Sequence, residues 1–254
     1  MANPVLMTVL DQVMTITINR PEARNAVDLA VATGIAEAID AADARDDVAA
    51  IILTGTGEHF CAGMDLKAFA AGEVPVVAGR GFAGITDRLP RKPLLAAVEG
   101  YALAGGTELA LSADIVIASR TASFGLPEVT RGLVAASGGV IRLAKTLPHH
   151  LAMELALTGD RLDASTAHHH GLVNHLTEPG GALDHARRIA AKIAANAPLA
   201  VDASKRIVAA TTGWSTPSHF AIQHEVAASV QASADALEGA RAFAQKRAPI
   251  WKGV

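Results

Sequence analysis

The sequence predicts an α/β fold, and two observations lead to this prediction. Over roughly the first 180 residues, short apolar runs of strand length alternate with alanine-rich helical patterns. Beyond that point only helical patterns remain. Strands that alternate with helices form βαβ units and mostly parallel sheets. We therefore predict a strand–helix core over residues 1–180 and a helical C-terminal region over residues 181–254.

The first elements follow from periodicity and a helix cap. Apolar side chains alternate over residues 13–18, which is the pattern of a strand. A polar turn over residues 19–25 follows, and Asp28 is a suitable N-cap for an alanine-rich helix over residues 29–44. The apolar run at residues 50–54 has the length of a buried strand. Together these segments predict the first β–α–β unit.

The same alternation continues downstream. We predict a strand at residues 94–98, a helix at 107–112 and another strand at 114–118. Glycine is frequent over residues 72–84, where we expect a mobile loop. Alanine-rich patterns then predict the C-terminal helices, over residues 182–196, 199–210 and 220–247.

Composition excludes several classes of protein. The chain has 254 residues, of which 50% are hydrophobic and 19% charged, enough for a full core. The net charge is −3 and no basic run is interleaved with aromatic residues, so we expect no nucleic-acid partner. No segment reads as a membrane span or a signal peptide, and we expect a cytoplasmic protein with no membrane partner.

Cysteine and histidine usage argues against a metal site. Cys61 is the single cysteine, so an intramolecular disulfide is excluded and a cysteine-rich metal site is implausible. Three histidines are adjacent at residues 168–170. Neighbouring side chains point in different directions on a helix or a strand, so these three do not readily share one ion. We therefore expect no metal.

Two glycine-containing turns could present free backbone N–H groups. Within residues 59–66, Gly63 permits a tight turn and Asp65 could cap a new helix. Within residues 100–109, a glycine pair opens a helix whose dipole favours developing negative charge, and Glu108 falls in its first turn. Both turns could therefore present backbone N–H groups to a ligand.

A third segment, residues 124–129, places Pro127 at a first helical position and Glu128 directly after it. Taken singly, Glu108 and Glu128 have a simpler explanation. Glutamate is common in first helical turns because it complements the helix dipole, by about 0.3–1 kcal/mol. Each glutamate alone is therefore weak evidence for catalysis.

Taken together, the segments make the chain resemble the crotonase (enoyl-CoA hydratase/isomerase) superfamily from about residue 5 to the C-terminus. The motifs that carry the resemblance are Arg20-Pro21 through Asn25-Ala26, His59 through Leu66, Gly100 through Ala110 with Asp114, Phe124 through Glu128, Gly138-Gly139 with Arg142-Leu143, Leu157 through Gly159, and Ala167 through Val173. The resemblance implies a crotonase-like ββα spiral core. It also implies a C-terminal helical trimerisation region that covers the CoA pocket, in a homotrimer or homohexamer.

The resemblance also implies a chemistry. The substrate would be an acyl-CoA thioester, its oxygen held by the backbone N–H groups of Met64 and Gly105, with no cofactor beyond the coenzyme A of the substrate. Glu108 and Glu128 would be the acid/base pair of an enoyl-CoA hydratase, which adds water reversibly across a 2-enoyl-CoA. Ala104 stands where glycine is frequent in the family, and we expect this departure to cost little.

The residues expected at the CoA moiety, again by resemblance, are Ala23, Arg24, Ala26, Ala62, Gly63, Asp65, Leu66 and Lys67. For Arg24 and Lys67 a solvated surface charge is the simpler interpretation. Two alternatives to the hydratase stay open: an enoyl-CoA isomerase or other crotonase-family reaction, and a non-catalytic acyl-CoA-binding protein. Relatives that shift a double bond often carry an acid eight residues after the second glutamate, where this chain has Ala136, so the isomerase is disfavoured.

Overall fold

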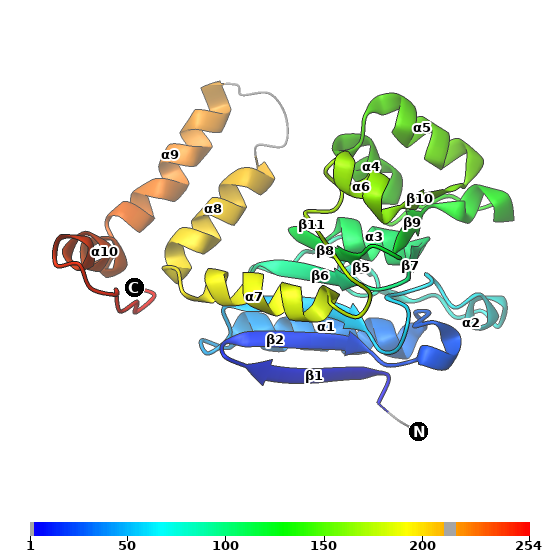
Figure 1. Ribbon diagram of the computed structural model, residues 1–254, viewed down its shortest axis with the longest axis horizontal. Helices are drawn as coiled ribbons and strands as arrows, with labels where there is room; N and C mark the ends of the chain where they lie inside the picture. The colour runs from blue at the N-terminus through cyan, green and yellow to red at the C-terminus, as the bar shows by residue number, and fades with distance from the viewer. Residues whose placement is uncertain (1–2, 211–216) are drawn as a thin grey trace. The chain divides into compact units, whose positions relative to one another are not determined.

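The computed structural model describes residues 3–210 and 217–254. The chain divides into two compact units, Met1–Ala190 and Ala191–Val254. The first unit contains the sheets, and the second contains helices (Figure 1). The functions that we expect for the C-terminal region, oligomerisation and coverage of the CoA pocket, stay predictions.

A six-stranded sheet forms the framework of the first unit. Its strands, in spatial order, are β1 (Val5–Leu10), β2 (Val13–Ile18), β3 (Ala50–Gly55), β6 (Leu94–Val98), β8 (Ile115–Ser119) and β11 (His175–Thr177). Only β1 runs antiparallel to its neighbour, and the other pairs are parallel. The predicted mostly parallel sheet is therefore confirmed. The edge strand β1 is an addition that the periodicity did not predict.

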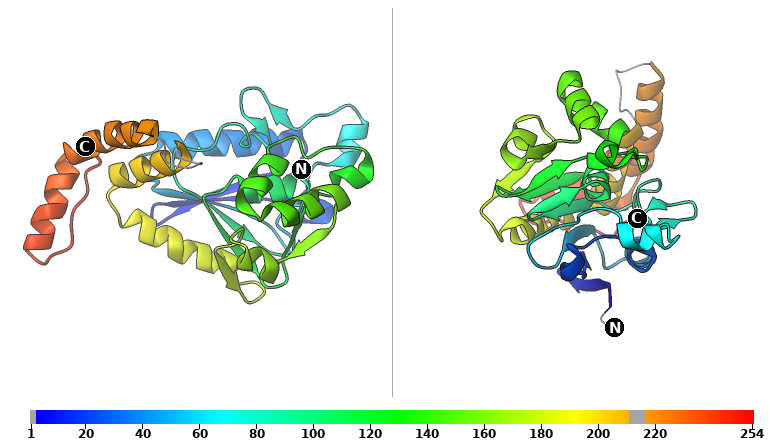
Figure 2. Two further views of the ribbon diagram at one scale, coloured as in Figure 1. Left: turned by 90° about the horizontal axis from the view of Figure 1, so that it is seen from above. Right: turned by 90° about the vertical axis from the view of Figure 1, so that its right-hand side faces the viewer.

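Helix α1 (Leu29–Ala44) covers one face of this sheet. It begins where predicted, because the Asp28 side chain accepts a hydrogen bond from Val31 N at 2.9 Å. Ile35 and Ile39 on its inner face are fully buried, as are the central side chains of β3. Figure 2 shows the sheet between α1, in blue, and α7 (Ala182–Ala194), in yellow.

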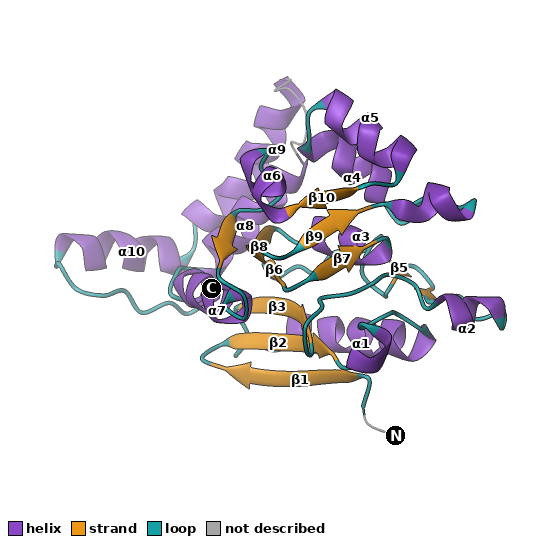
Figure 3. Cartoon of the chain, turned by 45° about the vertical axis from the view of Figure 1, so that its right-hand side comes forward, coloured by secondary structure: helices purple, strands orange, loops and turns teal. Residues whose placement is uncertain are grey.

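A second, smaller sheet positions the two candidate glutamates. Its strands are β7 (Tyr101–Leu103), β9 (Ser123–Gly125) and β10 (Arg161–Asp163), with β9 in the middle (Figure 3). Strands β7 and β9 are parallel, and Leu103 pairs with Gly125 at their carboxyl ends. Helix α3 (Gly105–Leu111) begins just after β7, and the 3₁₀ helix η2 (Pro127–Arg131) begins just after β9. Because parallel strands end at the same edge, the two helical turns and their glutamates come together.

The glycine-rich stretch at residues 72–84 contains more structure than expected. We expected a loop, but it includes a short hairpin of β4 (Val76–Val77) and β5 (Gly81–Phe82). Phe82 and the following Ala83 are buried. Packing of these few apolar side chains against the core overrides the high glycine content. The short helix α2 (Leu66–Ala70) precedes this segment.

The remaining helices of the first unit are α4 (Gly139–Thr146), α5 (His149–Thr158) and α6 (Ala164–His169). The second unit contains α8 (Pro198–Ala210), α9 (Pro217–Gln231) and α10 (Ala234–Ala244). The single helix predicted over residues 220–247 is wrong, because the chain turns between α9 and α10, where Ser233 Oγ accepts a hydrogen bond from Ala236 N at 3.1 Å. Across residues 3–210 and 217–254, no helix is both long and apolar enough to cross a membrane.

Candidate active site

Two backbone turns present unused N–H groups. The chain around Met64 is fixed on one side by Val27, whose N–H donates to Gly63 O at 2.8 Å and whose carbonyl accepts from Asp65 N at 2.8 Å. Gly105 is the first residue of α3, where the N–H has no partner within the helix. No hydrogen bond within the described residues uses the N–H of Met64 or of Gly105. Both donors are therefore available to a ligand.

The two turns lie against each other. Gly63 has φ +98°, a conformation that favours glycine. A Cβ atom built on Gly63 would lie 2.8 Å from the Ala104 Cβ and 3.1 Å from Gly105 N. A side chain at Gly63 would therefore separate the turns, and its absence allows the Met64 turn to approach the start of α3.

Ala104, directly before Gly105, has φ +52° and ψ −124°. This region of backbone conformation is favourable for glycine and strained for a residue with a Cβ, by roughly 1–3 kcal/mol. Ala104 N donates to Gly125 O at 2.9 Å, which holds the strained turn on β9. The positive φ argues against the expectation that alanine costs little here.

Glu108 is almost completely buried, and its carboxylate has backbone partners. Its Oε1 atom accepts hydrogen bonds from Ser137 N at 2.8 Å and from Gly139 N at 3.0 Å, at the N-terminus of α4. Burial raises the pKa of Glu108 above its ordinary value, and the two N–H donors and the positive charge of Arg142 oppose that rise. The two N–H donors and Arg142 thus offset part of the cost of burying the ionised form of Glu108.

Glu128 has different surroundings. Its Oε2 atom is buried and has no hydrogen-bond partner among the described residues. Burial raises the pKa of Glu128 to about 7, and the nearby charge of Glu108 adds to the rise. The structure therefore brings the two predicted glutamates together but gives them unequal environments. Glu108 has hydrogen-bond donors that favour its carboxylate form, and the buried Oε2 atom of Glu128 has none.

Ion pairs and side-chain hydrogen bonds anchor the Met64 turn. Arg20 pairs with Asp28 at 3.0 Å and with Asp65 at 2.9 Å. Asp65 Oδ1 also accepts from Lys67 N at 3.0 Å, which caps α2 as predicted. Asp65 is therefore occupied by partners within the chain, and its position indicates a structural role in holding the turn.

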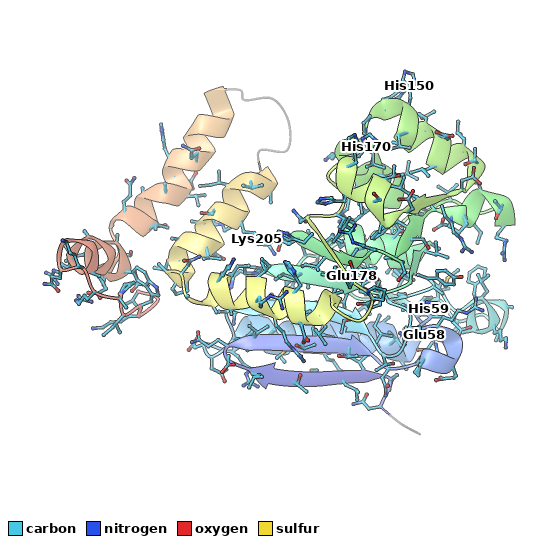
Figure 4. All side chains as sticks on the ribbon, viewed as in Figure 1. Glu58, His59, His150, His170, Glu178 and Lys205 are labelled. Atoms are coloured by element: carbon cyan, nitrogen blue, oxygen red, sulfur yellow. The ribbon has the colours of Figure 1, made fainter. Side chains whose placement is uncertain are left out.

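Buried Asn25 ties the turn at residues 20–26 to the loop before Cys61. Its Nδ2 atom donates to His59 O at 2.6 Å and to Thr56 O at 2.9 Å. His59, labelled with Glu58 in Figure 4, stacks its ring on that of Tyr101 with centroids 4.2 Å apart. These contacts fix the loop that leads into the Met64 turn.

The residues expected at the CoA moiety occupy two adjacent segments. Ala62 N donates to Arg24 O at 3.0 Å, which joins the turn at residues 20–26 to the turn at residues 61–65. The Arg24, Leu66 and Lys67 side chains are exposed. The Arg24 guanidinium lies 5.9 Å from the centre of the Tyr101 ring. The structure thus gathers the expected residues, and which of them touch a ligand stays a prediction.

Cys61 and the histidines show no sign of catalytic use. Cys61 is fully buried, and burial raises the pKa of its thiol to about 12, so it is not a thiolate at neutral pH. His150 lies on α5 and His170 is the C-cap residue of α6, so the two labelled histidines in Figure 4 come from different helices. Among the described residues, no group of three or more His, Cys, Asp or Glu side chains could hold a metal ion.

Sequence reasoning assigned no role to four residues that support the glutamates and the start of α3. These are Thr107, Ser137, Gly139 and Arg142. Thr107 Oγ1 accepts from Gly125 N at 2.9 Å and is 2.6 Å from Ala102 O and 2.8 Å from Gly125 O, so it joins α3 to both β7 and β9. The Gly138-Gly139 pair at the start of a helix is the one signal that could have pointed to a carboxylate site, by the rule applied to Gly105.

Comparison with known proteins gives the family. The family model described as "Enoyl-CoA hydratase/isomerase" matches residues 9–254. The chain belongs to this family. An enoyl-CoA hydratase from Mycobacterium tuberculosis, known from a crystal structure, is 57% identical, with a TM-score of 0.97 over 99% of this chain and 100% of that one. A homologous enoyl-CoA hydratase from Mycobacterium marinum is 56% identical, with a TM-score of 0.96 over 99% of this chain and 100% of that one.

A curated relative carries a different name. Carnitinyl-CoA dehydratase from Proteus mirabilis is 42% identical over 263 residues, covering 100% of both chains. The α/β crotonase-like fold and the membership of the crotonase superfamily are thus confirmed. This member of the enoyl-CoA hydratase/isomerase family is an enzyme of a family that acts on acyl-CoA thioesters. The reaction and the acyl group need a separate argument from the site.

Proposed function

We propose that this protein is an enoyl-CoA hydratase, which adds water reversibly across the double bond of a 2-enoyl-CoA. The observation that carries the proposal is the unequal pair of glutamates beside two unused backbone donors. Glu108 has two N–H partners for its carboxylate, and Glu128 has a buried oxygen without one. A coupled pair with separated pKa values can supply a base and an acid in one step.

Glu108 is the base and Glu128 is the acid in the hydration direction. Ionised Glu108 takes a proton from water as the water oxygen bonds to C3 of the thioester. The C2=C3 π electrons move toward the thioester carbonyl, and protonated Glu128 then delivers its proton to C2. Exchange with water afterwards removes the proton from Glu108 and restores that of Glu128, so one water is consumed overall. Assistance of this kind contributes about 10²–10⁴-fold to the rate.

Met64 and Gly105 form the oxyanion hole of the proposed reaction. As charge moves onto the thioester oxygen, their N–H groups would donate hydrogen bonds to it. One such preorganised donor contributes about 2.7–4 kcal/mol to transition-state stability. The anchoring of the Met64 turn by Arg20 and Asp65 supports this role, because the donors then need little reorganisation.

The CoA moiety would lie along the two turns joined by Ala62 and Arg24. The exposed Arg24 and Lys67 offer positive charge for its phosphates, and the exposed Leu66 offers apolar surface. Coenzyme A is part of the substrate here, so the proposed reaction needs no further cofactor. Replacement of Arg24 or Lys67 by Met should raise KM for the thioester and leave kcat nearly unchanged.

A second candidate is the dehydration of a 3-hydroxyacyl-CoA with a charged acyl end. It is favoured by the relatives named carnitinyl-CoA dehydratase. The chemistry at the two glutamates is the same reaction in reverse, and the acyl group is what differs. Relatives that shift a double bond often carry an acid where this chain has Ala136, and alanine cannot transfer a proton. The isomerase alternative is therefore disfavoured.

The deciding experiment follows the ultraviolet absorbance of the conjugated thioester with purified protein. Crotonyl-CoA, a longer 2-enoyl-CoA and carnitinyl-CoA are each tested, and products are identified by mass spectrometry. Loss of absorbance with formation of a 3-hydroxyacyl-CoA supports the hydratase. Gain of absorbance from carnitinyl-CoA alone would assign the second candidate. Tight thioester binding without any product would indicate a binding protein, and a shifted double bond without added water would indicate an isomerase.

We further propose that the protein assembles as a homotrimer or homohexamer. Several large apolar side chains of the first unit are exposed in the single chain, including Leu10 on β1, Ile141 on α4 and Leu157 on α5. Exposed apolar side chains in such number are more typical of subunit contacts than of free surface. Light scattering of the purified protein would measure the mass, and a monomer at micromolar concentration would contradict the proposal.

A further inference from the structure

We propose that Arg142 is a positioning residue for Glu108. The Arg142 side chain clamps the loop at residues 137–139 to the segment at residues 82–87. This inference rests on the proposed function, because it concerns how the proposed base is held. Arg142 lies on α4 and has no role in the reaction as derived so far.

The guanidinium group of Arg142 makes two hydrogen bonds to backbone carbonyls. Its Nη1 atom donates to Ser137 O at 3.2 Å, and its Nη2 atom donates to Thr86 O at 2.6 Å. Gly138 leaves the space for it, because a Cβ atom there would overlap Nη1. One side chain therefore joins the loop before α4 to Thr86, which lies 56 residues before Arg142 in the sequence.

The Ser137 end of this clamp leads directly to the proposed base. Ser137 donates its own N–H to Glu108 Oε1 at 2.8 Å, and its carbonyl accepts from Arg142. Gly139 N provides the second hydrogen bond to the same oxygen. The guanidinium group thus holds the peptide group that lies between the two N–H donors, and a displacement of that peptide would move both donors and Oε1.

The Thr86 end leads to the proposed oxyanion hole. Phe82, four residues earlier, is buried with its ring against Gly105, so that a Cβ atom on Gly105 would overlap the ring. Ile85 is fully buried in the same segment. Arg142 consequently links the base to the segment that packs on one of the two N–H donors.

Charge reinforces the geometric argument. The charged groups that face Glu108 are Arg142, from α4, and Glu128, from η2. The negative charge of Asp87 also acts on Arg142. Arg142 favours the ionised form of Glu108, and Glu128 opposes it whenever Glu128 is itself ionised. Removal of Arg142 should therefore both loosen the base and make it easier to protonate.

The test compares Arg142→Met and Arg142→Lys with a matched control, Lys145→Met. Lys145 is an exposed cation on the same helix, so its loss changes the net charge equally without touching the clamp. Steady-state hydration gives kcat and KM. Infrared difference spectra against Glu108→Gln give the pKa of Glu108 in the resting enzyme, whichever reaction the protein catalyses.

For Arg142→Met we expect kcat to fall by about tenfold or more with KM within roughly threefold, since a misplaced catalytic group lowers the rate of chemistry. The pKa of Glu108 should rise, because the positive charge that favours its carboxylate is lost. Arg142→Lys should leave the pKa of Glu108 close to that of the parent, because the positive charge is kept. Its kcat should recover only in part, because Lys cannot donate to both carbonyls as the planar guanidinium group does. Lys145→Met should change neither quantity.

Two results would overturn the proposal. One is an Arg142→Met enzyme with the kinetics and the Glu108 pKa of Lys145→Met. The other is an equal loss of kcat in Arg142→Lys and Arg142→Met when both variants have the melting temperature of the parent. If the parent enzyme hydrates no 2-enoyl-CoA, the proposed function fails, and the infrared titration of Glu108 still decides whether Arg142 governs that carboxylate.

Discussion

Gly139 and Glu108 are in direct contact: Gly139 N lies 3.0 Å from Glu108 Oε1, and a Cβ atom on Gly139 would lie 2.9 Å from that same oxygen. Gly139 does not have a positive φ, so alanine suits its backbone. The cost of Gly139→Ala would therefore fall mainly on the Glu108 side chain, with a further close contact to the Ala135 Cβ at 3.1 Å. We predict a loss of about 10²-fold in kcat, the size of effect that a displacement of about 1 Å can produce.

The matched control is Gly239→Ala in α10. A Cβ atom there would approach the Trp251 ring to 3.4 Å, an ordinary contact, and α10 has the same helical backbone. Hydration by Gly239→Ala should equal that of the parent. Equal activity in Gly139→Ala and the parent would show that Glu108 does not need its present position.

The environment of Glu128 makes the unfolding free energy depend on pH. The folded protein raises its pKa from 4.5 to about 7, mainly through burial. Between these values the folded state keeps a proton that the unfolded chain has lost, so this glutamate reduces stability as pH rises through the window. Glu128→Gln should therefore be more stable than the parent above pH 7, by about 1–2 kcal/mol once solvent screening of this half-buried group is included, and no more stable below the ordinary pKa of glutamate.

Thermal melts at a series of pH values would measure the effect of Glu128→Gln. Glu154→Gln, a change at an exposed carboxyl on α5, is the control and should show no such window. A stability difference between Glu128→Gln and the parent that is the same at every pH would mean that Glu128 ionises as it does in water.

Thr107 links the start of α3 to the small sheet through its hydroxyl. In Thr107→Val the buried Gly125 N–H loses its acceptor, which we expect to cost about 1–3 kcal/mol of unfolding free energy. Thr107→Ser keeps the hydroxyl and should lose less. Urea unfolding would measure both, and a Val variant as stable as the parent would show that the hydroxyl hydrogen bonds contribute nothing net.

At Ala104 we predict a substitution that raises the unfolding free energy, whereas Thr107→Val lowers it. Its φ of +52° strains the turn before Gly105, and glycine removes that strain. Ala104→Gly should therefore raise the unfolding free energy by about 1 kcal/mol, after the larger entropy loss of glycine is subtracted. An ordinary loss of about 0.5–1 kcal/mol, as for Ala→Gly within a helix, would contradict the account of strain.

The elements with clear local signals were predictable from sequence. The Asp28 cap, the helix after it and the buried strands at residues 50–54 and 94–98 each show a pattern that local physics favours. The strands of the small sheet are three residues each, too short to display a period. The turn between α9 and α10 was missed because alanine fills both helices, although Ser233 is a recognisable cap.

In the candidate site, too, some features could be predicted from the sequence and others could not. The positions of Met64, Gly105, Glu108 and Glu128 could be read from motifs that resemble a family. Their supporting contacts could not, because the hydrogen bond from Gly139 to Glu108 joins residues 31 apart and depends on how α4 packs. Which glutamate is better stabilised as a carboxylate likewise depends on tertiary contacts. The sequence leaves that choice open.

The measurement that tests the central claim most directly is the hydration of crotonyl-CoA by Glu108→Gln and Glu128→Gln, each compared with the parent enzyme. Gln keeps the size of the side chain and removes its acid/base function. If the two glutamates act as a pair, each variant should lose at least about 10²-fold in kcat, because each removes one proton transfer of the same step. Parent-like hydration by either variant would contradict a paired mechanism and leave a single catalytic base.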